Sequence, residues 1–122
     1  MIKRTIQTTT GKKIEGDGIE GVTMKLLVGK EDGAPTFAMR HFSVTSGGCT
    51  PRHQHNWEHE VLVLSGTGEI ECNGVTTPIS GGDSLFVPPS DLHQFRNIGT
   101  EELEFICIVP VASACGEPVP GS

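Results

Sequence analysis

Short apolar segments separated by turn residues constrain the fold of this chain more than any other feature of its sequence. The segments are rich in Val, Ile, Leu, Phe and Thr, and they cover residues 36–45, 60–65, 67–72, 84–87 and 104–111. Gly, Pro, Asn or Asp bound them, and a helical period of apolar residues is almost absent. Strand-length segments that recur with turns between them predict an all-β sandwich or barrel.

The turns between these segments are identified by their residue types. Asn73-Gly74 stands between residues 69–72 and 75–77, and this dipeptide is a strong signal for a β-hairpin. Residues 46–48, 81–83 and 88–90 mark further turns. The chain contains 16 Gly and 8 Pro among its 122 residues, and this high proportion argues against a helical bundle.

The length of 122 residues fits one compact domain and leaves no room for a second sizeable core. We expect a single barrel domain over residues 1–112 and a flexible C-terminal tail over residues 113–122, which contain Gly, Pro and Ser. The first thirty or so residues are expected to form short edge strands and turns that serve packing or partner pairing.

Charge and composition exclude several kinds of partner. The chain contains nine Lys and Arg but fifteen Asp and Glu, so its net charge is -6. This charge disfavours nucleic acid and anionic membranes as partners, because both need a basic surface. Because no apolar run approaches membrane-spanning length and no apolar leader stands at the N-terminus, we expect a cytoplasmic protein. The four cysteines are widely spaced without a CxxC pair, which argues against a disulfide framework and a cysteine-type zinc site.

The histidines carry the strongest functional signal in the chain. Four of the five lie within one region, at His53, His55, His59 and His93. Two histidines at i and i+2 on an extended segment point to the same face, which suits two ligands on one metal ion. Neutral imidazole is a common ligand of first-row transition metals. His41 stands alone in its segment and is left out of this predicted metal site.

The choice between His59 and Glu60 as a ligand follows from strand alternation. His59 has the parity of Val61 and Val63, whereas Glu60 shares its parity with Leu62 and Leu64 on the opposite face. Since a shift of one residue moves a side chain to the other face of a strand, we favour His59.

Residues 47–66 resemble the first motif of the cupin superfamily. That motif reads Gly, five residues, His-x-His, three or four residues, an acidic ligand, six residues and Gly, and the matching positions here are Gly47, His53, His55 and Gly66. Counting six residues back from Gly66 places His59 where the family's usual acidic ligand stands, with Glu60 one place out of register.

Residues 82–97 resemble the second cupin motif, with matches at Gly82, Pro88, His93 and Asn97. Ser90 departs from the pattern, which has a second Gly there. The all-histidine ligand set resembles that of small single-domain cupins of the four-histidine, manganese-binding type. This resemblance implies a double-stranded β-helix, or jelly-roll, barrel with one metal ion at its mouth, and often a homodimer formed through N-terminal strands.

Four neutral imidazoles would leave the charge of a divalent ion uncompensated, so such a site should favour a small anionic or chelating organic substrate. We expect one divalent transition metal ion, with Mn or Fe as the first choices and Zn, Ni, Co or Cu still open. Ca and Mg prefer oxygen ligands and are disfavoured.

Further residues could contribute around the metal, although no catalytic residue is assigned. Arg40 could orient an anionic substrate or form a surface ion pair. Glu60 could accept a hydrogen bond from a ligand histidine or lie on the surface. Phe95, Phe105 and Cys107 could line the barrel interior, where simple core packing is the favoured alternative for the two phenylalanines and for the thiol.

Three functions fit this site. The first is a metal-dependent oxidoreductase of dioxygenase type, which the all-histidine ligand set favours. The second is a non-redox metal-dependent enzyme, such as an isomerase or lyase acting on a sugar or small acid. The third is a small-ligand-binding protein without turnover. Fold resemblance alone does not choose among reaction classes.

Overall fold

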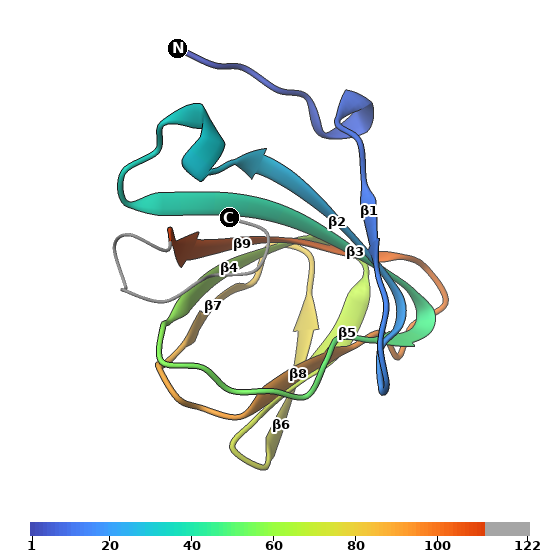
Figure 1. The fold of residues 1–122 in the computed structure, drawn as a ribbon. Coiled ribbons are helices and arrows are strands. Elements are labelled where there is room, and N and C mark those ends of the chain that lie inside the picture. The colour runs from blue at the N-terminus through green and yellow to red at the C-terminus, as the bar shows by residue number, and fades with distance from the viewer. Residues whose placement is uncertain (112–122) are drawn as a thin grey trace.

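The computed structural model describes residues 1–111, and these residues form a nearly all-β structure (Figure 1). Its strands are β1 (Lys12–Ile14), β2 (Glu20–Val28), β3 (Phe37–Cys49), β4 (His59–Ser65), β5 (Thr67–Cys72), β6 (Val75–Ser80), β7 (Ser84–Val87), β8 (His93–Arg96) and β9 (Leu103–Pro110). Two short 3-10 helices, η1 (Ile6–Thr8) and η2 (Lys30–Asp32), accompany them. All five predicted segments are strands, and the first extends to Cys49. The expected tail lies outside the described residues.

The strands form one antiparallel sheet in the order β6-β5-β8-β3-β9-β4-β7, with β2 paired to β3 and β1 to β2. Strands β6 and β7 stand at opposite ends of this order, yet only residues 81–83 separate them along the chain. Because consecutive Cα atoms lie only about 3.8 Å apart, so short a connection requires the sheet to curl until its two ends meet. The curled sheet in Figure 1 confirms the predicted all-β barrel.

The N-terminal strands differ from the expectation of short edge strands. Strand β2 has nine residues and lies between β1 and β3. It pairs with β3 from Glu20 opposite Cys49 to Val28 opposite Met39. Its side chains Val22 and Met24 are buried. Only the three-residue β1 is a short edge strand, because β2 gains a partner on each side through pairings between residues far apart in sequence.

Two turns bring the strands into register. The predicted hairpin joins β5 to β6, and Asn73 and Gly74 both adopt positive φ, at 49° and 80°. This is the geometry of a type I′ turn, which matches the twist of the two strands. Gly66, between β4 and β5, has a φ of 86°, and a Cβ atom there would lie 2.3 Å from the carbonyl oxygen of Glu102. Glycine is therefore required at position 66 by both conformation and space.

The inner face of the sheet holds the core, whereas part of the outer face is apolar and exposed. The fully buried side chains include Phe105, Leu103, Val22, Val44 and Val63. On the outer face of β3, β4 and β7, the exposed apolar side chains are Phe37, Met39, Leu62, Leu64 and Phe86. Among the described residues, no helix is long and apolar enough to span a membrane.

Candidate metal centre

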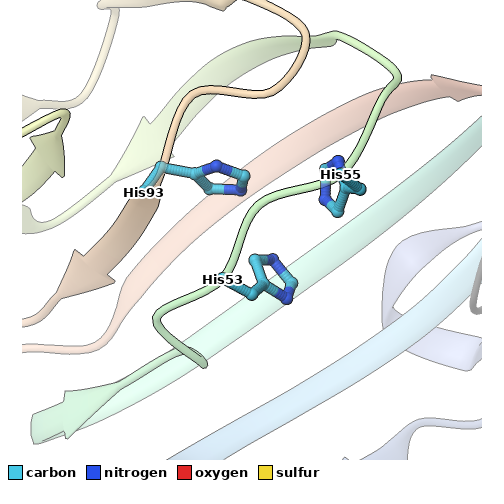
Figure 2. Close-up of side chains that lie close together, drawn as sticks. All are labelled: His53, His55 and His93. Atoms are coloured by element: carbon cyan, nitrogen blue, oxygen red, sulfur yellow. The ribbon is translucent and has the colours of Figure 1, made fainter.

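Three histidines lie close together (Figure 2), of which His53 is exposed, His55 is half-buried and His93 is buried. His53 and His55 lie in the segment between β3 and β4, and His93 begins β8. The backbones of His53 and His93 pair in both directions, with N–O distances of 3.1 and 2.9 Å, and this bridge places the two side chains next to each other. The candidate ligand atoms of His53, His55 and His93 all lie within 4.8 Å of one another.

His59, the first residue of β4, packs against this cluster, and β4 directly follows the segment that carries His53 and His55. Its Nε2 atom lies 3.0 Å from Nε2 of His55, and its ring centroid lies 4.9 Å from that of His93. Two nitrogen ligands at about 2.1 Å from an ion, separated by a right angle, would be about 3.0 Å apart, whereas a tetrahedral angle would separate them by about 3.4 Å. The spacing between His55 and His59 is compatible with two ligands of one ion, whereas the set of ligand atoms that all lie within 4.8 Å of one another comprises His53, His55 and His93.

Backbone carbonyls set the tautomers of two of these rings. Nδ1 of His93 lies 2.9 Å from the carbonyl oxygen of Asp91, and Nδ1 of His55 lies 3.3 Å from that of Trp57. A carbonyl oxygen can only accept, so in the neutral rings each Nδ1 carries the proton and each Nε2 has a free lone pair. Metal-binding histidines are commonly oriented by such contacts through the second ring nitrogen.

The environment of the cluster keeps the imidazoles neutral. Desolvation, followed by the neighbouring imidazoles, lowers the pKa of His53 to about 4. Desolvation is also the main reason why the pKa of His55, His59 and His93 lies below the usual value. Neutral imidazole is the form that binds metal, so the donor set fits a divalent transition metal ion at pH 7.

The cluster opens into a cavity of about 400 Å³. Much of the lining is apolar, and its apolar members include Ile14, Val22, Met24, Phe42, Phe95 and Phe105. The rings of Phe95 and Phe105 stack with their centroids 4.4 Å apart, and Phe42 stacks on Phe105 at 5.3 Å. These phenylalanines therefore contribute both to the core and to the cavity wall, so the two alternatives considered from sequence are compatible.

Arg40 places a positive charge in the wall of this cavity. Its side chain is buried, its Nη2 donates to Sγ of Cys107 at 3.3 Å, and its guanidinium lies 5.1 Å from the centre of the Phe42 ring. After desolvation and neighbouring imidazoles, the charge of Arg40 also helps to lower the pKa of His53 and His59. Arg40 is thus positioned to attract an anion into the cavity.

The remaining predicted residues occupy different surroundings. Cys107 lines the cavity beside Arg40, and burial raises the pKa of its thiol. Glu60 is exposed on the outer face of β4, where a hydrogen bond with Glu58, followed by partial burial, raises its pKa to about 6. The alternation expected along β4 is present, because His59, Val61 and Val63 are buried. His41 pairs with Glu104 at 3.0 Å, outside the cluster.

Sequence reasoning missed several residues that contribute to the site. The Trp57 ring stacks on His55 with the centroids 4.1 Å apart and the planes inclined by 5°. As the single Trp beside three histidines, it could have been noticed from the sequence. Val22 and Met24 of β2 line the cavity because β2 pairs with β3, and no local sequence pattern predicts that pairing.

Comparison with known proteins connects this geometry to a family. Residues 40–109, more than half of the chain, match the family model described as Cupin domain (Cupin 2). The chain is 30% identical over 114 residues to an oxalate-binding protein of Thermotoga maritima, covering 89% of this chain and 93% of that protein.

Two further similarities show how varied the relatives are. The structure of the polyketide cyclase RemF from Streptomyces resistomycificus aligns with a TM-score of 0.82 and 29% identity, covering 90% of this chain and 80% of that one. The alginate biosynthesis protein AlgA of Pseudomonas fluorescens is 35% identical over 72 residues, or 57% of this chain. The match spans only 15% of the length of AlgA.

Proposed function

Because this chain belongs to the cupin superfamily, we propose that it is a metal-dependent enzyme that binds a small chelating organic anion at its histidine cluster. The first candidate reaction is an oxidation of dioxygenase type. The observation that carries the proposal is the convergence of His53, His55, His59 and His93 on an apolar cavity that also contains Arg40.

The four imidazoles would hold one divalent ion, with Mn or Fe as the first choices. Such an ion supplies Lewis acidity and, when it is redox-active, one-electron chemistry. The neutral ligands would leave its charge uncompensated, and Arg40 adds a further positive charge nearby. An anionic group on the substrate would therefore be attracted to this end of the cavity.

The cavity walls indicate the rest of the substrate. A volume of about 400 Å³ with phenylalanine walls is larger and more apolar than a two-carbon dianion requires. We propose that a carbon-rich body, such as a ring bearing adjacent oxygens, packs against Phe95, Phe105 and Phe42, and that these side chains exclude water. The side chain of Arg40 would orient the anionic group.

A second candidate is a non-redox reaction, such as a metal-assisted cyclisation or isomerisation. The similarity to the polyketide cyclase over 90% of this chain favours this alternative. Non-catalytic binding of a small ligand is the third candidate, and the similarity to the oxalate-binding protein favours it. The three candidates share the metal site and differ in what happens to the bound molecule.

One experiment separates these candidates. The protein is purified without added metal, its metal content is measured by elemental analysis, and oxygen uptake is followed with flavonol, diketone and catechol substrates. We expect near-stoichiometric Mn or Fe and metal-dependent oxygen uptake with at least one substrate. Conversion without oxygen would support the second candidate, and binding without conversion would support the third. Absence of stoichiometric transition metal would contradict the proposed centre.

We also propose that two copies associate through the exposed apolar face of the sheet. Met39 pairs with Ile108, Ile108 with Glu60, and Glu60 with Phe86, so one row of outer-face residues crosses four strands and is apolar except for Glu60. Phe86 ends this row and is 59% exposed, and Phe37, two residues before Met39 on β3, is 66% exposed. A contiguous apolar face that packs on itself is the usual basis of a two-fold dimer.

Sedimentation equilibrium tests this association. The wild-type protein should sediment as a dimer at micromolar concentration, and Leu62→Glu should shift it to monomer because a charge would be buried in the interface. Val75→Glu serves as the matched control, since Val75 is exposed on the distant β5–β6 hairpin. A wild-type monomer at these concentrations would contradict the proposed dimer.

A further inference from the structure

The sulfur of Cys107 lies between two side chains of the candidate site. Nδ1 of His59 lies 2.9 Å from this sulfur, and Nη2 of Arg40 donates to the same atom at 3.3 Å. Cys107, Arg40 and His59 are 2%, 7% and 6% exposed, so water does not compete for these contacts. The three residues come from β9, β3 and β4, which are neighbours in the sheet.

His59 differs from His55 and His93 in the partner of its Nδ1 atom. The latter two face backbone carbonyls, which accept only and so place the proton on Nδ1. A thiol can either donate or accept, so the protein sets the tautomer of His59 through a side chain rather than through its backbone. If the thiol donated to Nδ1, the His59 proton would move to Nε2 and occupy the ligand position.

Arg40 shows that the sulfur of Cys107 acts as an acceptor, although its S–H group can still donate. A guanidinium has donors only, so its contact makes the Cys107 sulfur an acceptor and attracts electron density toward it. A sulfur that already accepts from a positive group is well placed to accept from His59 Nδ1–H as well. Without a metal ion, the 3.0 Å contact between Nε2 of His59 and Nε2 of His55 needs a proton on one of these two atoms. An ion held by both atoms would take the place of that proton and leave the His59 proton on Nδ1, where the Cys107 sulfur can accept it.

We propose that Cys107 is a positioning residue of the metal site: its sulfur, fixed by Arg40, holds His59 in the tautomer and orientation that bind metal. The inference rests on the metal centre proposed above. Losing such an outer contact typically weakens metal binding by about 10–100-fold. Neither the spacing of the histidines nor the cupin motifs include Cys107, which the curled sheet brings to His59 from 48 residues further along the chain.

The test compares two substitutions of the same residue. Cys107→Val keeps a buried apolar side chain but removes the acceptor, and we expect the Zn²⁺ dissociation constant to rise about tenfold or more. Cys107→Ser retains a group that can donate and accept, and it should stay within about threefold of wild type. Val109→Ala is the matched control, because it truncates a buried residue of the same strand that lies outside the cavity lining.

Imidazole ¹⁵N spectra of the zinc-loaded protein supply a readout that a merely structural role would not move. The His59 proton should reside on Nδ1 in wild type and Cys107→Ser, with a changed Nδ1 shift in Cys107→Val and none in Val109→Ala. Unchanged zinc affinity and His59 shift in Cys107→Val would overturn the inference, as would an equal loss of affinity in Val109→Ala. A wild-type protein that takes up no zinc or other transition metal would instead overturn the metal centre itself.

Discussion

His53 and His93 pair through their own main chains, whereas His59 reaches the cluster from the first position of β4. Individual side chains therefore enter the site by different routes, and their ring nitrogens are oriented by different partners. Carbonyl oxygens orient His55 and His93, and a thiol contacts His59. Substitutions at single residues can separate ligands from the groups that position them.

Replacement of individual histidines tests the ligand set. His55→Ala and His59→Ala should each lower metal affinity about tenfold or more, because even the loss of outer contacts costs about 10–100-fold. His41→Ala is the control, since His41 contacts Glu104 outside the cluster and should leave metal content unchanged. Elemental analysis after purification without added metal measures the effect. Unchanged metal content in both His55→Ala and His59→Ala would contradict the assignment.

Ser90 carries a local conformational cost that a glycine would relieve. It has a φ of 69°, at the position where the cupin pattern has glycine, and its N–H donates to the carbonyl of His55 at 2.7 Å. The left-handed region costs a non-glycine residue about 1–2 kcal/mol, partly offset by the entropy that glycine loses on folding. Ser90→Gly should therefore stabilise the protein by about 0.5–1 kcal/mol in urea unfolding, and any loss of stability would contradict this account.

At the scale of elements, β3 organises the sheet because it pairs with β2, β8 and β9. Its C-terminal end leads into the segment that carries His53 and His55, while its central part contributes Arg40 to the cavity. Strand β9 continues the sheet from β3 to β4, and so brings Cys107 between Arg40 and His59. The arrangement of the site thus depends on register across three neighbouring strands.

Two glycines in turns allow the cost of positive φ and the cost of crowding to be measured separately. Gly74 has a φ of 80° and open space around its Cα, whereas a Cβ on Gly66 would collide with the backbone of residues 102 and 103. Gly74→Ala should cost about 1–2 kcal/mol of unfolding free energy, the price of positive φ alone. Gly66→Ala should cost distinctly more, because backbone atoms cannot rotate away as a side chain can. Equal losses in urea unfolding would show that crowding at position 66 is relieved.

At the scale of the whole molecule, the curled sheet surrounds neutral imidazoles with low-dielectric walls. The histidines come from different parts of the chain, yet they lie close enough that, after desolvation, neighbouring imidazoles help to lower the pKa of His53 and His59. The stability of the fold and the binding of metal are consequently linked through the same groups.

The stability of the metal-free protein should fall as the pH is lowered from 7 toward 4. In the unfolded chain the histidines bind protons near pH 6.5, whereas the folded pKa of His53 is about 4 and that of His59 is also lowered. Over this interval the unfolded state binds more protons, so the contribution is present above pH 6.5 and is lost as pH falls. Urea unfolding across this range measures it, with His59→Gln expected to show a shallower dependence. Stability that rises toward pH 4 would contradict neutral imidazoles in the folded protein.

Much of the fold and part of the site could be predicted from sequence because the relevant signals are local. Alternation along residues 59–64 predicts that His59 faces inward, and burial of His59 beside exposed Glu60 agrees with it. Asn73-Gly74 predicts its hairpin because both residues tolerate positive φ. The length and position of β2 could not be predicted, since its partners β1 and β3 are chosen by pairing across the chain.

The sequence by itself determined the strand segments, the turns between them and the histidines that approach one another over short spacings. These follow from alternation and backbone preference, which act within a few residues. Only the tertiary structure decided that Arg40, Cys107 and His59 meet and that Trp57 stacks on His55. The physical reason is that strand register and sheet curvature are set by packing of the whole core.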